Sequence, residues 1–160
     1  MMINKKYICA WCLVFFVLYS CNKREYVINE SKIIEDEKWK VENLLPFCFA
    51  VSDTQQVYEI GLNVRYTAEY PKQNMYIFLH TVFPDGMRMH DTLSVDLFSQ
   101  MGEAFGKGKR VKELQKVFSY VRFPMKGDYT MTIEQAMRMD TLQGVASVGL
   151  FIVKPIKTNK

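Results

Sequence analysis

Two histidines are the side chains best suited to acid–base or metal chemistry. His80 lies within an apolar segment, and His90 directly precedes Asp91-Thr92. A Ser-His-Asp site is defined by its geometry, but the sequence has no G-x-S-x-G motif to present a serine nucleophile. Two histidines without metal-ligand spacing do not predict a zinc site. We therefore expect strand histidines with ordinary hydrogen bonds, and we expect no enzyme activity, no metal and no cofactor.

The basic segment Lys107-Gly108-Lys109 invites comparison with a phosphate-binding loop. That loop requires G-x₄-G-K-[ST], but Met101 and Glu103 occupy the positions of the first glycine, and no Ser or Thr follows either lysine. The aspartates between residues 85 and 96 likewise lack the spacing of an EF-hand. The sequence therefore predicts neither a nucleotide site nor a calcium site.

Three of the four cysteines have no expected catalytic or redox role. Cys9 and Cys12 form a C-x₂-C motif, but both lie in an apolar run that we expect to be removed from the chain. Cys48 lies in the segment Phe47–Val51, where alternation puts it on the same face as Ala50. We interpret Cys48 as a small buried hydrophobic residue.

The fourth cysteine, Cys21, is predicted to be a lipid attachment site. Lys5 and Lys6 give a basic start, and Tyr7–Tyr19 is an unbroken apolar or aromatic run. A membrane span needs about 20 apolar residues, so this shorter run fits a signal peptide better. The alternative, a buried helix followed by an ordinary cysteine, would show a 3.6-residue periodicity that is absent here.

The residues around Cys21 resemble the lipobox of bacterial lipoproteins. Leu18-Tyr19-Ser20-Cys21 has Leu three residues before the cysteine and a small residue just before it. The resemblance implies a diacylglycerol on the thiol, cleavage before Cys21 and acylation, as with palmitate, of the new amine. Because one acyl chain binds a membrane only marginally, three chains make a stable anchor.

The location of the anchored protein follows from the residues after Cys21. Asn22-Lys23-Arg24 contains no acidic cluster, whereas some lipoproteins of gliding bacteria resemble one another in an acidic run that sends them to the cell surface. We therefore expect residence in the outer membrane, facing the periplasm. Loss of Lys5 and Lys6 lowers the formal net charge of +4 by two, and export further disfavours a nucleic-acid partner.

Residues 1–20 are thus expected to form the signal peptide, residues 21–38 a tether with a candidate edge strand at 26–28, residues 39–153 one domain, and residues 154–160 a disordered tail. Within the domain, Val57–Tyr66 alternates apolar and polar residues, as a half-buried antiparallel strand does. Four further strands are expected at residues 75–83, 117–123, 129–136 and 145–153. Short strands separated by turns predict an all-β antiparallel sandwich.

The region between Asp91 and Leu114 leaves two interpretations open. Residues 94–104 form either a short helix or a strand with a loop, and three glycines then make a flexible basic loop. Phe105 within that loop is either a core residue or an anchor for a partner protein. Met137 and Arg138 are a second candidate contact, although a lateral salt bridge between Arg138 and Asp140 is the preferred interpretation.

Short motifs follow one another in a set order from residue 39 onward. They are Trp39, Phe47-Cys48-Phe49, Tyr58–Tyr66, Tyr70–Tyr76, Phe83-Pro84-Asp85-Gly86, Asp91-Thr92-Leu93, Phe123-Pro124, Gly127-Asp128-Tyr129, Glu134-Gln135-Ala136-Met137-Arg138, Asp140, Leu142 and Val148-Gly149-Leu150. With the lipobox upstream, this order resembles the gliding-motility lipoprotein family GldH over nearly the whole mature chain. Phe105 stands where the family favours Trp.

The resemblance implies a cell-envelope lipoprotein associated with surface gliding and the linked protein-secretion apparatus, with no known reaction or ligand. We therefore expect a non-enzymatic accessory or assembly component, held to the membrane by Cys21 and contacting proteins of that machinery. The alternative is a glycan-binding sandwich with exposed aromatic side chains as a stacking platform. A row of exposed aromatic residues favours the glycan hypothesis, and a contiguous apolar or Met/Arg patch favours docking.

Overall fold

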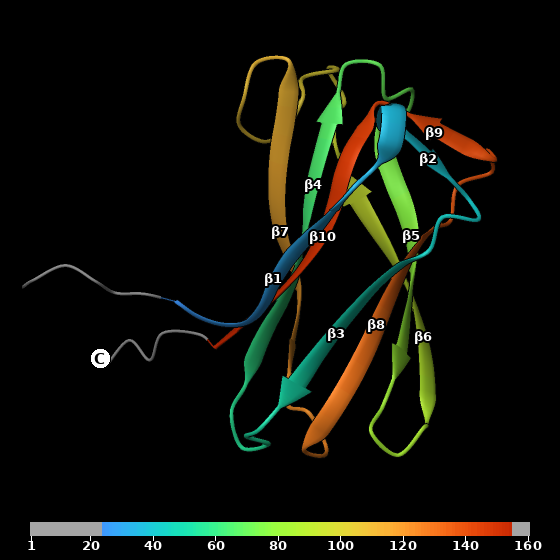
Figure 1. The fold of residues 1–160 in the computed structure, drawn as a ribbon. Coiled ribbons are helices and arrows are strands. Elements are labelled where there is room, and N and C mark those ends of the chain that lie inside the picture. The colour runs from blue at the N-terminus through green and yellow to red at the C-terminus, as the bar shows by residue number, and fades with distance from the viewer. Residues whose placement is uncertain (1–23, 155–160) are drawn as a thin grey trace, which may run out of the picture.

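The computed structural model describes residues 24–154 as an antiparallel β-sandwich (Figure 1). The elements, in chain order, are β1 (Glu25–Ile33), the 3₁₀ turn η1 (Glu35–Glu37), β2 (Lys38–Lys40), β3 (Leu45–Val51), β4 (Tyr58–Thr67), β5 (Asn74–Val82), β6 (Arg88–Asp96), β7 (Val111–Val121), β8 (Gly127–Gln135), β9 (Thr141–Gln143) and β10 (Val145–Lys154). The predicted all-β sandwich is confirmed.

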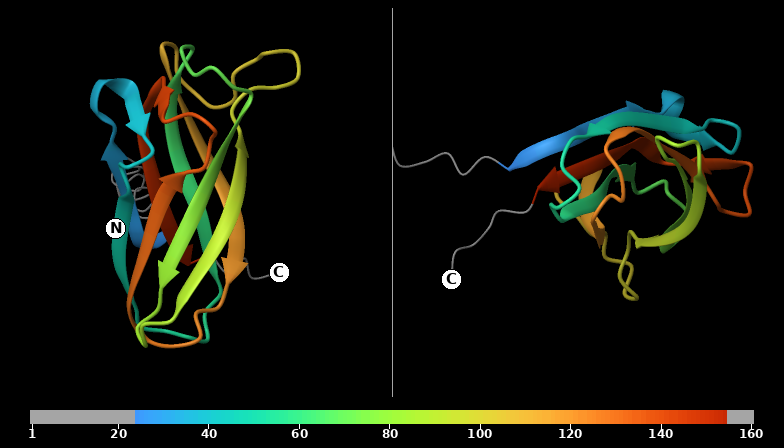
Figure 2. Two further views of the ribbon diagram at one scale, coloured as in Figure 1. Left: turned by 90° about the vertical axis from the view of Figure 1, so that its right-hand side faces the viewer. Right: turned by 90° about the horizontal axis from the view of Figure 1, so that it is seen from below.

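Two four-stranded sheets form the two layers. Sheet I has the order β1-β10-β4-β7, and sheet II has the order β3-β8-β5-β6. A separate pair, β2 and β9, lies at one end (Figure 1). In the view from below, β1 lies beside β3, so the two sheets adjoin along this side (Figure 2). Within residues 24–154, no helix has the length and apolar character needed to span a membrane.

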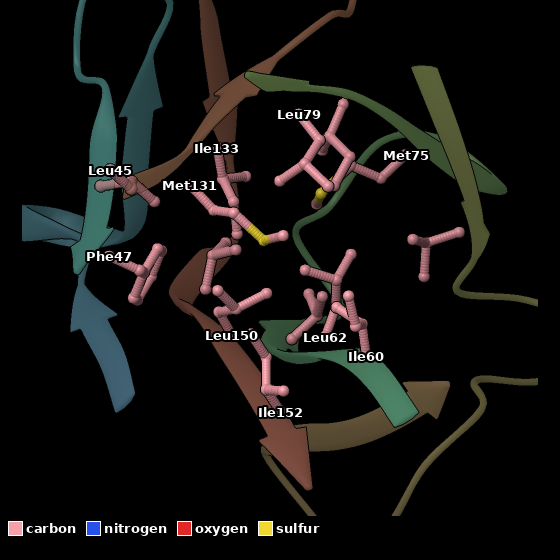
Figure 3. Close-up of a cluster of buried hydrophobic side chains, with 14 of the residues drawn as sticks. Leu45, Phe47, Ile60, Leu62, Met75, Leu79, Met131, Ile133, Leu150 and Ile152 are labelled. Carbon is pink, nitrogen blue, oxygen red and sulfur yellow. The ribbon is translucent and has the colours of Figure 1, made fainter. Parts of the chain in front are cut away.

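The alternation in β4 places its apolar face toward sheet II. Tyr58, Ile60 and Leu62 are buried, and so are Val64 and Tyr66 further along the same face. Figure 3 shows Ile60 and Leu62 opposite Met75 and Leu79 of β5 in the buried cluster. Burying one such side chain stabilises the fold by roughly 1.5–3 kcal/mol, so the two-residue period of β4 fixes which face packs inward.

The strand expected at residues 26–28 extends over Glu25–Ile33 and pairs with β10 as an edge of sheet I. β1 therefore belongs to the sandwich itself. Residue 24 is the first described residue, and the signal peptide, Cys21 and residues 155–160 lie outside the described part of the chain.

The helix considered at residues 94–104 is absent. Those residues instead complete β6 and begin a small hairpin, in which Phe98 bridges Ala104. β6 pairs with β5 over its whole length, so backbone pairing with a neighbouring strand outweighs the weak helical pattern of this segment.

The interpretation of Cys48 as a buried residue is wrong. β3 alternates strictly, and its buried positions are the odd-numbered ones, Leu45, Phe47, Phe49 and Val51. Cys48 therefore lies on the outer face, where it is exposed and its Sγ is 3.6 Å from Oγ1 of Thr130. The alternation was recognised correctly, but the wrong face was assigned to the core.

Candidate functional site

The segment between β6 and β7 is a structured loop held by one buried tyrosine. The hydroxyl of Tyr66 lies 2.5 Å from the carbonyl oxygen of Leu97 and 2.7 Å from that of Phe105, so its proton is shared between the two ends of the hairpin. Phe105 also donates its backbone N–H to the carbonyl of Leu97 at 2.8 Å. Burial raises the pKa of Tyr66, which keeps this hydroxyl protonated and able to donate.

The three glycines of this loop have positive φ angles that turns require. Gly102, Gly106 and Gly108 have φ angles of 81°, 89° and 115°. At Gly106 and Gly108, an added Cβ would lie within 2.4 Å of a backbone carbonyl oxygen of β7. The glycines are therefore explained by backbone geometry, and they give no independent indication of function.

Phe105 lies at the surface of this loop. Its side chain is 42% exposed, whereas its neighbours Phe98 and Ala104 pack against the core. The backbone of Phe105 is fixed at both its N–H and its carbonyl by the contacts of the loop. An apolar ring on a fixed backbone can enter a partner's pocket with little loss of conformational entropy.

Met137 and Arg138 follow the end of β8 in a bend. The Sδ of Met137 accepts the backbone N–H of Tyr76 at 3.2 Å, so Met137 covers an otherwise open donor beside β5. Arg138 is exposed. In the described part of the chain no ion pair joins Arg138 to Asp140, and the preferred salt bridge is therefore not formed.

The predicted contact residues do not form one cluster. Phe105 lies on the β6–β7 loop, and Met137 and Arg138 lie on the β8–β9 connection; no hydrogen bond among the described residues joins the two segments. Both segments lie toward the same end of the sandwich, the upper end in Figure 1.

A histidine pair that the sequence analysis did not connect lies on the outer face of sheet II. His80 of β5 is directly opposite His90 of β6, and their Nδ1 atoms are 2.6 Å apart. The other ring nitrogen of His80, Nε2, lies 2.7 Å from Oε2 of Glu134 on β8. The arrangement is satisfied when His80 donates from Nε2 to the carboxylate and accepts at Nδ1 the proton of His90.

This Glu134–His80–His90 chain borders an open pocket of about 370 Å³, which Leu44, Arg88 and Thr132 also line. Among residues 24–154 no hydroxyl group is hydrogen-bonded to either imidazole, and no three His, Cys, Asp or Glu side chains have an arrangement that could hold a metal ion. The hydrogen bonds among Glu134, His80 and His90 can fix the orientation of both imidazole rings across three strands. This arrangement lacks the adjacent nucleophilic side chain that covalent catalysis requires.

Two aromatic side chains continue the same outer face. Tyr76 and Phe78 occupy successive outward positions of β5, four and two residues before His80, and are 45% and 40% exposed. The strand expected at residues 75–83 corresponds to β5, which lies between β8 and β6 in sheet II. No further layer covers the outer face of β5 in the described structure, and Met137 borders this face where its Sδ accepts the N–H of Tyr76.

The fold and these surfaces define an antiparallel β-sandwich domain with a structured loop at one end and an exposed outer face on sheet II. The chain belongs to the GldH lipoprotein family, whose sequence profile matches residues 26–152. The family is that of the gliding motility lipoproteins, in agreement with the resemblance of the motifs from Trp39 to Leu150.

Two relatives cover nearly the same length. The chain is 30% identical over 147 residues to a gliding motility lipoprotein GldH homolog of Christiangramia forsetii, covering 86% of this chain and 90% of the relative. It is 26% identical over 147 residues to the gliding motility lipoprotein GldH of Flavobacterium johnsoniae, covering 88% and 91%.

One solved structure, the dimeric latent PorU of Porphyromonas gingivalis, aligns with 84% of this chain and 14% of its own. The sequence identity is 9% and the TM-score is 0.32, which is too low to establish a shared fold.

Proposed function

We propose that this protein is a lipid-anchored, non-enzymatic assembly component of the gliding and protein-secretion machinery. The observation that carries the proposal is the family match over residues 26–152. The relatives of similar length are both gliding motility lipoproteins by name. A role in assembly, without turnover of a substrate, is supported by the open character of the surfaces described above.

The domain docks a protein partner through the end of the sandwich that carries the β6–β7 loop. Phe105 is the anchor residue, because it combines an exposed ring with a backbone fixed by Tyr66. Arg138 contributes from the β8–β9 connection. Aromatic and arginine residues supply much of the binding energy in protein interfaces.

The proposed attachment is through acyl groups on Cys21 in the outer membrane, with the domain in the periplasm. Glu25, the first residue of β1, follows Cys21 by only four residues. The tether is therefore short, and the sandwich lies close to the membrane surface.

The attachment is tested by replacing Cys21. Cys21→Ala is expected to abolish palmitate labelling and to leave either uncut precursor or a protein released from the membrane. Cys48→Ser is the matched control, because Cys48 is an exposed thiol of the described domain, and it is expected to label normally. Undiminished labelling of Cys21→Ala would contradict the anchor.

The orientation is tested with protease added to intact cells. A periplasmic domain is expected to survive this treatment and to be digested only after the outer membrane is permeabilised. Digestion of the domain in intact cells would place it on the cell surface instead.

The glycan-binding alternative rests on Tyr76 and Phe78. Their rings lie on one outer face of β5, which is the arrangement a sugar-stacking platform needs. This alternative predicts that Tyr76→Ala lowers retention on immobilised envelope glycans at least tenfold, while Tyr120→Ala on β7 leaves retention unchanged. Equal retention of the wild type and Tyr76→Ala would remove the support for glycan binding.

A further inference from the structure

The four edge strands of the sandwich differ in how well they are protected from pairing with another chain. An unprotected edge carries free N–H and C=O groups that can accept a further strand. β1 has a bulge between Tyr26 and Ile28, and β3 contains Pro46 and lies beside β1. β7 is bulged opposite Ile60 and Gly61, and Lys107 of the loop pairs with its residue Glu113.

β6 has none of these features. Its nine residues pair with β5 without any register shift from Arg88 to Asp96, and the strand contains neither proline nor lysine. All but two of its side chains are exposed. Bulges, prolines, lysines and inward-pointing charges are the usual means by which edges are blunted. β6 has only the last of these, Asp91, on the same face as Leu93 and Val95, so it is the least protected edge of the described sandwich.

The residues of β6 are complementary to those of a second β6 strand that runs antiparallel to it. A two-fold axis perpendicular to sheet II places side chains of the same face opposite one another. Such an axis passes midway between one residue and the same residue of the second copy, and that residue is described below as lying on the axis. With Thr92 on the axis, Arg88 lies opposite Asp96 of the second copy, and Met89 lies opposite Val95 of the second copy. The two remaining pairs, His90 with Ser94 and Asp91 with Leu93, contain no like charges. Thr92 itself meets Thr92 of the second copy, a favourable cross-strand pair.

Neighbouring registers lack this complementarity. With Asp91 on the axis, two carboxylates would lie directly opposite one another, which destabilises a strand pair. With His90 or Leu93 on the axis, fewer residues are paired and Arg88 loses its acidic partner. The charges of β6 therefore select the register centred on Thr92.

We propose that β6 pairs antiparallel with β6 of a second copy of this chain about an axis through Thr92. The two copies of sheet II, each of four strands, then form one continuous sheet. Arg88 has no ion pair within residues 24–154, and the nearest cation to Asp96 is Lys116 at the loose distance of 4.0 Å. Both charges are therefore available to the second copy.

The symmetry agrees with attachment to one membrane. An axis perpendicular to sheet II keeps sheet I of both copies on the same side, and β1, which begins four residues after Cys21, belongs to sheet I. Both anchors of the dimer thus reach the same surface, with the outer faces of sheet II directed away from it. The pairing itself does not depend on the proposed docking function.

Thiol cross-linking of the full-length protein in native membranes tests the register. The Thr92→Cys variant, combined with Cys48→Ser, is treated with a short bifunctional thiol reagent. It is expected to give a covalent homodimer, because directly opposite Cβ atoms are only about 4.5–5.5 Å apart. The wild type is the control, since its exposed Cys48 lies on β3 at the far edge of sheet II and is expected to stay monomeric.

A charge exchange in that same cross-linkable background tests the complementarity. Arg88→Asp alone or Asp96→Arg alone is expected to lower the yield of homodimer at least fivefold, because each places like charges opposite one another. The double variant Arg88→Asp/Asp96→Arg reverses both pairs and is expected to restore the yield. Circular dichroism melting checks that all variants are folded.

Absence of a homodimer in the Thr92→Cys variant would overturn the proposal, as would a cross-link from Thr92→Cys to a different protein. Failure of the folded double variant to recover the yield would also overturn it. Normal partner binding and normal gliding in a Phe105→Ala variant that still forms the homodimer would contradict the proposed docking function and leave the β6 pairing standing.

Discussion

At the scale of single residues, the exposure of Phe105 separates its two interpretations. A buried phenylalanine replaced by alanine costs roughly 3–5 kcal/mol of unfolding free energy. Phe105 is 42% exposed and does not join the buried cluster. We therefore expect Phe105→Ala to change the unfolding free energy by about 1 kcal/mol or less, as surface substitutions do, and to weaken complex formation and gliding or secretion.

Phe47 supplies the matched comparison, because it is fully buried on β3. Phe47→Ala is expected to show the full cost of a core truncation in urea unfolding and to lower the protein level. A stable Phe105→Ala protein with normal partner binding and normal phenotype would refute the docking role. A cost as large as that of Phe47→Ala would show that Phe105 is a core residue.

Buried tyrosines predict a loss of stability at alkaline pH. Burial raises the pKa of Tyr70 in the folded protein well above its ordinary value, and it also raises those of Tyr58, Tyr66 and Tyr129. The unfolded chain therefore loses these protons first, near pH 10. By linkage, their contribution is fully present below about pH 10 and declines as the pH rises further.

Tyr70→Phe isolates this effect. The variant loses the hydrogen bond that the Tyr70 hydroxyl donates to the carbonyl of Asn74, which costs about 1 kcal/mol near neutral pH. Above pH 10 its unfolding free energy is expected to fall less steeply than that of the wild type. Urea unfolding at a series of pH values measures both slopes, and parallel slopes would contradict the assignment to Tyr70.

At the scale of elements, a glycine and an aromatic ring join β4 to β10. Gly61 lies opposite Phe151, and a Cβ at residue 61 would lie 2.0 Å from Cζ of Phe151 and 2.7 Å from the carbonyl oxygen of Lys116. Phe151 is fully buried although it lies on the face of β10 away from sheet II. Gly61 thus makes room for the ring that covers the centre of sheet I.

Gly61→Ala is expected to destabilise the fold by roughly 1–3 kcal/mol, as overpacking does. In a double-mutant cycle with Phe151→Ala, the double variant should be more stable than the sum of the two single effects, because the ring that clashes is gone. Relief should be incomplete, since the contact with the backbone of Lys116 remains. Additive effects in thermal or urea unfolding would show that the two residues are not coupled.

The strands that the sequence predicted well are those whose two faces differ in polarity. β4 was predicted within one residue at each end, because its alternation is strict. β6 was missed because its exposed side chains carry no apolar period. A hairpin signal was nevertheless present, since His80 and His90 lie five residues before and after Asp85 in the turn Pro84-Asp85-Gly86. A strand paired symmetrically about that turn would have brought the two histidines together.

Other features depend on long-range pairing that one sequence does not reveal. Glu134 reaches His80 because β8 pairs with β5, although these strands are separated by more than 40 residues. The exposed outer face at Tyr76 and Phe78 follows from the absence of a third layer over sheet II in the described structure. The sequence therefore predicts that the apolar residues of β5 lie in a strand, but it does not predict which of them are exposed.

At the scale of the whole molecule, the order of short strands and turns predicted the sandwich, and the motif order predicted the family. We propose a domain held next to a membrane by Cys21, with a fixed loop at one end that presents Phe105. In this proposal, that end of the sandwich contacts a protein of the cell envelope while the domain remains anchored.

Site-specific photo-crosslinking in native membranes tests whether this end of the sandwich contacts a partner protein. A photoreactive phenylalanine analogue replaces Phe105 in one strain and Tyr120 in another; Tyr120 is 67% exposed and lies near the opposite end of the sandwich, paired with Glu59. We expect a discrete adduct with an envelope protein from position 105, none from position 120, and loss of the adduct when Cys21→Ala is added. Absence of an adduct at position 105, or the same adduct from both positions, would contradict this proposal.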